Sequence, residues 1–388
     1  MSVRREHPAK SPGGRSPPAS ICIIRLSAIG DCCHTLAVAR SIQTAWPETP
    51  VTWIIGRTEY GLMKGISGIE FITFDKSAGY RGYQHLRREI GDREFAVLLH
   101  MHASMRANLV SLCVRAKTRL GFDRLRARDY QWLFTNERIP ARPRQHVMDG
   151  MFQFLEYIGL SERSLHWDIP VSEADREFAE SICGQARPVC VISPCSSQRF
   201  RNFRNWAAGN FSALADYMHQ RHKAHVILTG GNTRTEKQYG QEIQAGLNFP
   251  VSNLIGETNL KQLLAILGCA DIVICPDSGP AHMATAVGTP VVGLYATSNR
   301  YRTGPYHSQQ FVADRYPDAV QLEFGKPVDQ VKWGQRVRNP DAMNLIKLAD
   351  VTRKVDLALS QVPPTHSAKP DPALYPEDNA NGLTDSHD

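Results

Sequence analysis

The chain has 388 residues, of which 42% are hydrophobic and 21% charged, a composition that is typical of a folded globular protein and excludes a fibrous or wholly disordered one. Its 45 Lys and Arg residues exceed its 38 Asp and Glu residues by too little to indicate nucleic acid, although the excess suits an anionic substrate or an anionic membrane surface. Runs of about 18 apolar residues do not occur, so we expect no transmembrane helix, and we expect no nucleic-acid partner.

Both ends of the chain have the composition of tails. Residues 1–19 and 362–388 are rich in proline and polar residues and poor in branched apolar ones, so we expect them to be disordered. Residues 1–19 also lack the apolar segment of a secretory signal, and several of the nine cysteines lie in apolar runs, where we interpret them as reduced thiols. These features predict a cytoplasmic protein.

Between the tails, short apolar segments alternate with helix-like stretches. The segments that we expect to be strands are 21–26, 51–55, 95–100, 189–193, 224–230, 271–275 and 290–295. Buried strands that alternate with helices are typical of parallel sheets and of the α/β class. Because the pattern occurs twice, we predict two Rossmann-like domains, 20–180 and 187–361, with a connection near 170–188.

The first strand leads into a candidate catalytic segment, LSAIGDCCHTLAVA at 26–39. Asp31 follows a turn and precedes a helical pattern, so one interpretation makes it a helix N-cap and nothing more. In the other, Asp31 lies in the cleft at the carboxyl ends of the strands and accepts a proton from a substrate hydroxyl. The helix N-terminus would lower the pKa of Asp31, which keeps the carboxylate ionised but weakens it as a base.

A basic stretch, 81–130, follows in the first half of the chain and carries more Arg and Lys than Asp and Glu. Most of it is expected to be solvated surface. Part of it could receive an anionic acceptor or an anionic lipid head group.

A loop with hydroxyl and guanidinium groups opens the second half, SPCSSQRFRNFRNW at 193–206. Ser196, Ser197 and Arg204 have the chemistry that binds a diphosphate. The alternative is a solvated basic loop in which Trp206 belongs to the core.

The segment 275–306 contains a turn, Asp277–Gly279, between a buried strand and a helix that begins near Pro280. A Ser-Gly turn before a helix offers backbone N–H groups to an anion, which predicts phosphate binding. The alternative is a tight strand–helix turn in which Asp277 and Ser278 only cap the helix. Nucleotide-loop and hydrolase signatures such as GxxxxGK[ST], GxSxG and HExxH are absent from the sequence, as is an Asp-x-Asp pair that would hold a metal-bridged nucleotide-sugar.

From about 21 to about 356 the chain resembles the family 9 glycosyltransferases, the ADP-heptose:lipopolysaccharide heptosyltransferases of Gram-negative bacteria. The resemblance rests on an ordered series of motifs, Ser27–Leu36, Gly256–Leu260, Asp277–His282, Gly288–Pro290 and Thr297–Tyr306. It implies a GT-B fold, in which two Rossmann-like domains face each other across a cleft. The N-terminal domain would hold the acceptor and the C-terminal domain the ADP-sugar, which is a substrate, and no cofactor or metal would be needed.

The resemblance also implies roles for individual residues. Asp31 would be the general base of an inverting transfer. Arg204 stands where the family usually has a diphosphate-binding lysine. The expected donor contacts are Ser196, Ser197, Arg204, Glu236, Asp277, Ser278, Gly279 and His282. The expected acceptor contacts are Ser27, His34, Arg57, Arg124 and Arg128.

The function that these observations favour is transfer of heptose from ADP-heptose to the lipopolysaccharide inner core, either to Kdo-lipid A or to a core that already carries heptose. Two alternatives stay open: a GT-B transferase with another nucleotide-sugar, and a non-catalytic nucleotide-binding protein on the same fold. Because the acceptor is anchored in lipid, we also expect weak association with the anionic cytoplasmic face of the inner membrane through the stretch 81–130.

Overall fold

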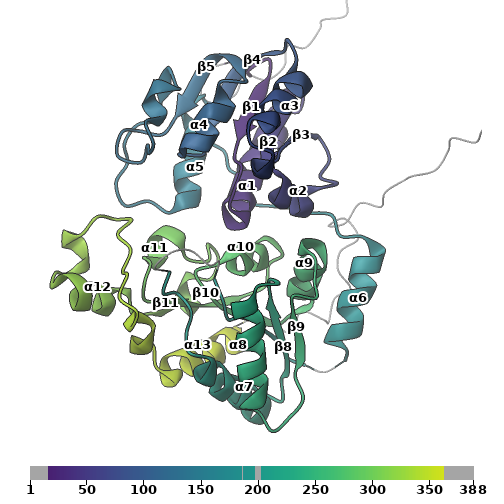
Figure 1. Cartoon of the computed structure of the whole chain (residues 1–388), viewed down its shortest axis with the longest axis vertical. Coiled ribbons are helices and arrows are strands. Elements are labelled where there is room, and N and C mark those ends of the chain that lie inside the picture. Colours follow the sequence, from purple (N-terminus) through teal and green to yellow (C-terminus); the bar gives the residue numbers. More distant parts are fainter. Residues whose placement is uncertain (1–15, 186, 197–201, 362–388) are drawn as a thin grey trace, which may run out of the picture.

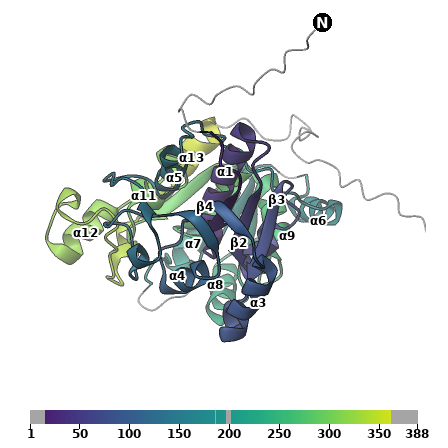
Figure 2. The same ribbon diagram turned by 90° about the horizontal axis from the view of Figure 1, so that it is seen from above.

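The computed structural model describes residues 16–185, 187–196 and 202–361, and these form two lobes that are each built on a parallel six-stranded sheet (Figure 1). The two Rossmann-like domains predicted from the sequence are therefore confirmed as α/β units. Ser197 and most of the predicted tails lie outside the described residues. Seen from above, the first domain overlies the second (Figure 2).

The first domain contains the sheet with strand order β3-β2-β1-β4-β5-β6. Its strands are β1 (Ile21–Ile24), β2 (Val51–Gly56), β3 (Ile69–Phe74), β4 (Glu94–His100), β5 (Arg115–Gly121) and β6 (Glu137–Arg138). Its α-helices are α1 (Ile29–Ala45), α2 (Arg57–Met63), α3 (Tyr80–Ile90), α4 (Met105–Ser111) and α5 (Val147–Tyr157). In β1 the side chains of Ile21 and Ile23 join the apolar cluster of α1 and α5, whereas Cys22 and Ile24 join that of α3 and α4. Helices on both faces explain why this strand is apolar throughout.

The second domain contains the sheet with strand order β12-β11-β10-β7-β8-β9. Its strands are β7 (Val189–Ile192), β8 (His225–Gly230), β9 (Ser252–Ile255), β10 (Ile272–Pro276), β11 (Val291–Tyr295) and β12 (Ala313–Asp314). Its α-helices are α7 (Ala208–His222), α8 (Arg234–Ala245), α9 (Leu260–Cys269), α10 (Gly279–Ala286), α11 (Arg300–Thr303), α12 (Tyr316–Phe324) and α13 (Leu348–Gln361). Each of the seven predicted strand segments is a strand here, and β3, β5, β6, β9 and β12 are additional.

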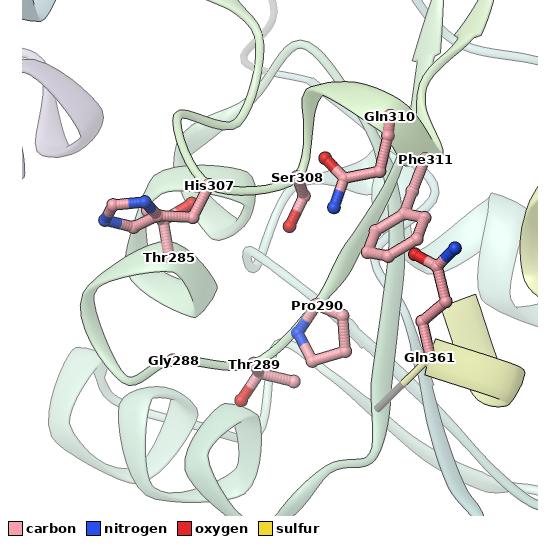
Figure 3. A pocket seen from close by; sticks show the side chains of 9 residues that line it. All are labelled: Thr285, Gly288, Thr289, Pro290, His307, Ser308, Gln310, Phe311 and Gln361. Carbon is pink, nitrogen blue, oxygen red and sulfur yellow. The ribbon is translucent and has the colours of Figure 1, made fainter. Parts of the chain in front are cut away.

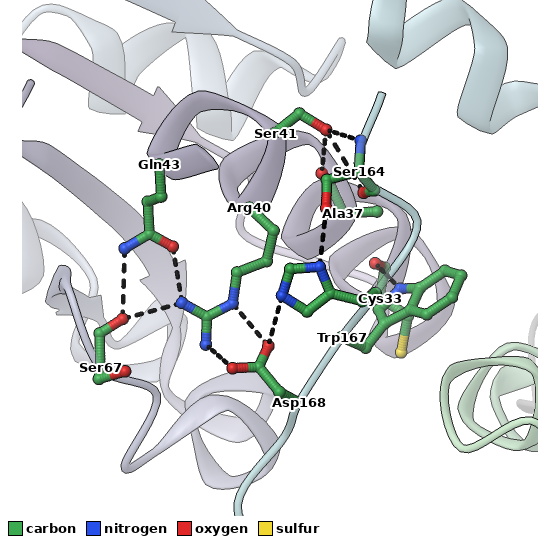
Figure 4. Close-up of polar contacts among 10 residues, drawn as sticks. Cys33, Ala37, Arg40, Ser41, Gln43, Ser67, Ser164, Trp167 and Asp168 are labelled. Atoms are coloured by element: carbon green, nitrogen blue, oxygen red, sulfur yellow. Dashed lines mark hydrogen bonds and ion pairs between the residues drawn. The ribbon is translucent and has the colours of Figure 1, made fainter. Parts of the chain in front are cut away.

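The segment that connects the domains is fastened to α1 before it leaves the first domain (Figure 4). Arg40 forms two hydrogen bonds of 2.7 Å with the carboxylate of Asp168, and the Trp167 indole donates to the carbonyl of Cys33 at 2.8 Å. Arg40 is buried, so this ion pair is shielded from solvent. The connection then forms α6 (Glu173–Cys183), which packs against α9 of the second domain.

Helices α1 and α10 bring the two domains together. A Cβ added at Gly30 would lie 2.2 Å from Cδ2 of His282, and one added at Gly279 would lie 3.6 Å from Cβ of Ile29. The apolar residues of α1, α5, α9 and α10 form a single cluster across the boundary. Among the described residues, no helix is both long and apolar enough to cross a membrane.

Candidate active site

Two motifs that lie about 250 residues apart in the sequence meet at the boundary between the domains. One follows β1 and contains Gly30 and Asp31; the other follows β10 and contains Asp277 and His282. The carboxyl ends of parallel strands are where α/β proteins bind their ligands. The contact between Gly30 and His282 therefore places a carboxylate of the first domain beside the predicted phosphate-binding turn of the second.

Asp31 lies in the first turn of α1, and the N-cap position belongs to Ala28, so the interpretation of Asp31 as the N-cap is wrong. Its carboxylate forms an ion pair with Arg25, and about 32% of its side chain stays accessible. Arg25 also donates to the carbonyl of Met101 at 2.6 Å, which fixes the guanidinium. Burial by itself would raise the pKa of Asp31, but the adjacent Arg25 guanidinium acts against it, and this pKa lies below its ordinary value.

Arg25 is a functional residue that sequence reasoning missed. It lies at the carboxyl end of β1, six residues before Asp31. The apolar residues before Arg25 predict only a buried strand. An arginine at the end of such a strand is, however, a signal of a buried carboxylate nearby. The direction of the pKa shift agrees with the expectation from the helix N-terminus, but its largest favourable cause is this ion pair.

Three histidines surround the contact between the domains. The ring of His34 lies edge-on to His282, with 4.6 Å between centroids, and to His146 at 5.5 Å. Nδ1 of His146 accepts a hydrogen bond from the Met148 N–H, and Nε2 is 2.9 Å from the Gly304 carbonyl, so Nε2 carries the proton. Burial lowers the pKa of all three histidines, that of His146 to about 4. The ring cluster is therefore neutral at pH 7.

Arg204 is buried in the second domain and bonded to the turn after β10. Nη1 of Arg204 donates to the carbonyl of Asp277 at 2.6 Å and to its Oδ2 at 3.1 Å, and Nε donates to Oδ1 of Asn202 at 2.7 Å. Asn202 in turn donates to Oγ of Ser196 at 2.8 Å. The interpretation of this segment as a solvated basic loop is therefore wrong for Arg204, while Trp206 is fully buried, as that interpretation expected.

The N-terminus of α10 is the other donor-side feature. Ser278 occupies the N-cap position, but its hydroxyl donates to the carbonyl of Pro276 and does not cap the helix. The capping alternative is therefore wrong for Ser278, because its side chain does not cap the first N–H groups of α10. Those groups, together with the helix dipole, favour an anion at Gly279.

Glu236 is placed at the same sheet edge, in the first turn of α8 after β8. Its carboxylate accepts hydrogen bonds from the Gly231 N–H at 2.8 Å and from the Thr233 hydroxyl at 2.6 Å. The side chain is therefore already used to hold the turn between β8 and α8. A contact with a nucleotide ribose stays a prediction.

A pocket of about 580 Å³ opens at the carboxyl edge of the first sheet. It is lined by residues that follow β1, β2, β3 and β4, and Ser27 and Arg57 of the predicted acceptor set are among them. Arg106 of the basic stretch 81–130 lines it as well, as do Lys76 and His102, which sequence reasoning did not single out. Asp31 does not itself line the pocket, but His102 does, and His102 lies close enough to Asp31 to interact with its charge.

The other predicted acceptor residues lie elsewhere. His34 faces the histidine cluster between the domains rather than this pocket. Arg124 and Arg128 are exposed on the loop between β5 and β6 and do not line the pocket. Arg119 departs from the expected solvated surface of 81–130, because its guanidinium donates to the carbonyls of Val114, Ser111 and Phe134.

Arg302 of α11 is a second residue that sequence reasoning missed. It is half-buried, and its Nε lies 3.2 Å from the position that a Cβ at Gly334 would occupy, so the bare backbone of Gly334 flanks it. Burial lowers the pKa of Arg302, while the charges of Asp31 and Asp277 act against that shift. Its position inside the motif Thr297–Tyr306 was the signal that could have found it.

A second, smaller pocket of about 220 Å³ lies at the amino end of β11 (Figure 3). Its hydroxyls are bonded within the fold: Thr289 donates to the carbonyl of Leu267 at 2.6 Å, and Ser308 accepts from the Val291 N–H at 3.1 Å. It is therefore a packing feature and not part of the site. Within the described part of the chain, no three His, Cys, Asp or Glu side chains gather as metal ligands would.

The comparisons with known proteins agree with this geometry. The family model "Glycosyltransferase family 9 (heptosyltransferase)" matches residues 83–331, more than half of the chain. The protein "Lipopolysaccharide core heptosyltransferase OpsX" of Haemophilus influenzae is 40% identical over 334 residues, which are 86% of this chain and 95% of that protein. "Lipopolysaccharide heptosyltransferase 3" of Escherichia coli is 22% identical and covers 85% of this chain and 96% of its own length.

Solved structures show the same fold. A glycosyl transferase family 9 protein from Veillonella parvula superposes with a TM-score of 0.72 at 21% identity, covering 89% of this chain and 98% of its own. E. coli heptosyltransferase WaaC, solved with ADP, gives a TM-score of 0.67 at 15% identity and covers 87% of this chain and 99% of its own. The GT-B architecture expected from the motifs is thereby confirmed. The chain belongs to glycosyltransferase family 9 and is a heptosyltransferase.

Proposed function

We propose that this enzyme transfers heptose from ADP-heptose to the inner core of lipopolysaccharide, with inversion at the anomeric carbon and with Asp31 as the general base. The observation that carries the proposal is the meeting of α1 and α10, because it joins an acceptor-side carboxylate and a donor-side phosphate turn in one site. Two similarities support the substrates: OpsX is named for the lipopolysaccharide core, and WaaC was solved with ADP.

In the proposed reaction a hydroxyl of the acceptor attacks the anomeric carbon from the side opposite the ADP. The new glycosidic C–O bond forms while the C–O bond to the β-phosphate breaks, and the hydroxyl proton passes to Asp31. Because the pKa of Asp31 is low, the carboxylate becomes an effective base only as the attacking oxygen acquires positive charge. Proton transfer therefore accompanies bond formation rather than preceding it.

The departing ADP carries negative charge that the second domain is built to receive. The uncapped N-terminus of α10 offers backbone N–H groups. Ser196 is linked to Arg204 by hydrogen bonds that pass through Asn202. Arg302 adds a second cation near Asp31 and Asp277. Because Ser196 and Arg204 are already buried and hydrogen-bonded, they need little reorganisation when charge develops.

The acceptor is proposed to occupy the pocket of the first domain, either as Kdo-lipid A or as a core that already carries heptose. Arg57, Lys76 and Arg106 supply the cations that an acidic or phosphorylated sugar would bind. Glu59, Asp75 and Asp129 line the same pocket, and Asp75 pairs with Arg57 at 3.1 Å, so Lys76 and Arg106 are the proposed contacts of the acidic group. The reaction needs no metal or cofactor in this scheme. We further propose that the enzyme works at the cytoplasmic face of the inner membrane, where the lipid anchor of such an acceptor resides.

The test is release of ADP from ADP-heptose, with and without Kdo-lipid A, together with mass analysis of the lipid product. Fast release that depends on the acceptor, with a heptose added to the lipid, is the expected result. Turnover with UDP- or GDP-sugars but not with ADP-heptose would replace the donor assignment. Binding of ADP without turnover on Kdo-lipid A would replace this acceptor by a core that already carries heptose, which is then tested in the same way.

A further inference from the structure

The large apolar side chains that stay exposed are concentrated in one part of the first domain. Seven of the twelve exposed large hydrophobic residues in the described chain lie within 105–133. Single exposed apolar residues are ordinary, but a cluster of them marks an interaction surface. The cluster comes from two segments, helix α4 and the loop between β5 and β6.

Helix α4 exposes large apolar side chains and buries polar ones next to its core residues Ala107 and Val110. Met105, Leu109 and Leu112 follow one another at helical spacing and are 40%, 40% and 58% exposed. Asn108 and Ser111, by contrast, are completely buried and hydrogen-bonded within the domain. Because the buried amide and hydroxyl are hydrogen-bonded, the unfavourable contribution in water is the exposure of Met105, Leu109 and Leu112, and this face is therefore suited to a less polar environment.

The loop between β5 and β6 repeats the same arrangement. Gln131 is completely buried, and its side-chain amide donates to the carbonyl of His100 at 2.8 Å while its oxygen accepts from the Phe122 N–H at 3.2 Å. Its neighbours Tyr130 and Trp132 are 64% and 46% exposed. The loop is therefore a fixed turn that presents aromatic side chains.

Asp129 joins the two segments into a single surface. Its carboxylate accepts from the Met105 N–H at 2.9 Å, and its carbonyl accepts from the Asn108 side chain at 2.6 Å. Met105 and Asp129 also line the acceptor pocket, so the surface borders the mouth of that pocket. The surface, here called the 105–133 face, consists of Met105, Leu109, Leu112, Leu125, Tyr130, Trp132 and Leu133.

We propose that the 105–133 face inserts its apolar side chains into the interfacial layer of an anionic bilayer, so that the acceptor pocket opens toward a lipid-anchored sugar. The exposed Arg106, Arg124 and Arg128 are interleaved with the apolar residues, and guanidinium groups at this position would meet anionic head groups. Trp and Tyr side chains are enriched at membrane–water interfaces. This inference rests on the proposed function for the identity of the acceptor, and it adds insertion to the purely electrostatic docking expected from the sequence.

The direct test is co-sedimentation of the full chain with vesicles of phosphatidylethanolamine and phosphatidylglycerol at about 50 and 500 mM salt. Between these two salt concentrations the Debye length falls roughly threefold, so electrostatic attraction is screened more strongly. We expect part of the binding to survive the high salt. Replacing Leu125, Trp132 and Leu133 together by serine should lower the vesicle partition coefficient in high salt at least about tenfold, because burial of even one leucine-sized side chain has an effect of that order.

The matched control replaces Leu322 and Val328, exposed apolar residues of the second domain, by serine and should leave partitioning unchanged. Because all of the substituted side chains are exposed, thermal midpoints within a few degrees of wild type should show that the fold is intact. Leu109→Ser with Leu112→Ser, on the other segment of the face, should reproduce the loss.

Activity separates this inference from the proposed function. The triple serine variant should transfer heptose normally to a water-soluble, delipidated core acceptor and poorly to the same core embedded in vesicles. Failure of the wild-type enzyme on both acceptors would remove the proposed function, while the vesicle binding would still test the face. Loss of all binding in high salt, or equal binding by the variant and its control, would overturn the inference. A variant that loses self-association, with lipid binding unchanged, would assign the face to a second copy of the chain.

Discussion

The two sides of the site are built differently, although each lies at the carboxyl edge of a six-stranded parallel sheet. On the donor side Ser196, Arg204, Asp277 and His282 are all buried, and the first three belong to one network of short hydrogen bonds. On the acceptor side the pocket holds about 580 Å³ and includes Arg57, whose side chain is 77% exposed.

The difference agrees with what each side binds in the proposed function. A nucleotide-sugar donor is a small ligand of fixed structure, so a rigid site can be preorganised for it. Preorganisation lowers the free-energy cost of binding the donor and of stabilising its departing phosphate. A lipid-anchored oligosaccharide is large and arrives from one direction, so its site has to be open. Asp31 belongs to the open side, where an ion pair with Arg25 fixes its carboxylate. Its neighbour Gly30 packs directly against His282 of the closed side.

The largest effect should come from Asp31. Asp31→Asn keeps the shape of the side chain but removes the base, and we expect kcat to fall by about 10²–10⁴-fold while ADP affinity changes little. Steady-state rates and calorimetric titration with ADP measure the two quantities separately. An equal loss in both would mean that Asp31 contributes to donor binding instead.

Arg204→Ala should disturb the closed side. ADP binding should weaken by about 1.5–3 kcal/mol, the range for hydrogen bonds to charged groups. The fold should also lose stability, by as much as about 3–5 kcal/mol, because the buried Asp277 carboxylate loses its partner. Arg204→Lys retains the charge and should lie between the two proteins in calorimetry and in thermal unfolding. Wild-type ADP affinity in Arg204→Ala would show that the guanidinium is purely structural.

Gly30→Ala tests whether the two sides have to touch. The added Cβ would overlap the ring of His282, and overpacking of this kind costs about 1–3 kcal/mol. We expect a lower free energy of unfolding and a lower kcat, since Asp31 is the next residue. Gly209→Ala is the control, because nothing lies within 4 Å of a Cβ added there. If both variants behave alike in denaturant titration and in turnover, α1 and α10 are not pressed together in the working enzyme.

Arg302→Gln should have a moderate effect on the chemistry. Removing this half-buried cation should lower kcat/KM for the donor about tenfold, less than the loss of a fully enclosed oxyanion donor. Lys326→Gln removes the same charge from an exposed position of the second domain and serves as the control. A difference that disappears at high ionic strength would indicate a long-range field rather than a contact with the substrate.

The sequence allowed the central part of this architecture to be predicted because buried parallel strands are continuously apolar. β1, β7 and β10 are such strands, and they lie in the middle of their sheets. Strands at or next to the sheet edges were missed for the opposite reason. β5 (RAKTRLG) has three cationic side chains, and β9 (SNLI) is short and half polar.

The site was predictable where a motif is local and not where it depends on the fold. Asp31, Asp277 and His282 stand in compact motifs, whereas the partners of those residues come from other segments. Nothing in the sequence around Arg204 indicates that its partner is Asp277, 73 residues further along. The apolar 105–133 face was hidden as well, because burial of Gln131 and Asn108 reverses the polarity that a pattern of residue types predicts.

The smallest expected effect is the dependence of the rate on pH, and it decides between two kinds of base. Asp31 has a pKa below its ordinary value, so it is ionised throughout the neutral range and loses its charge only as the pH falls through that low pKa. Burial lowers the pKa of His102 to about 3 and that of His146 to about 4, so both are neutral over the same range. We therefore expect kcat to be nearly constant between about pH 6 and 7.5, whereas a histidine base with an ordinary pKa near 6.5 would give a rising limb there.

The same groups make stability, unlike the rate, depend on pH. In the unfolded chain these histidines take up protons below about pH 6.5, but in the folded protein they resist protonation until about pH 4 or lower. The unfolded state therefore binds more protons in that interval, and the free energy of unfolding falls as the pH decreases from about 6.5 to 4. Initial rates should be taken only where thermal unfolding shows an intact fold. A limb in kcat near pH 6.5 at constant stability would then transfer the role of base from Asp31 to a histidine of the cluster.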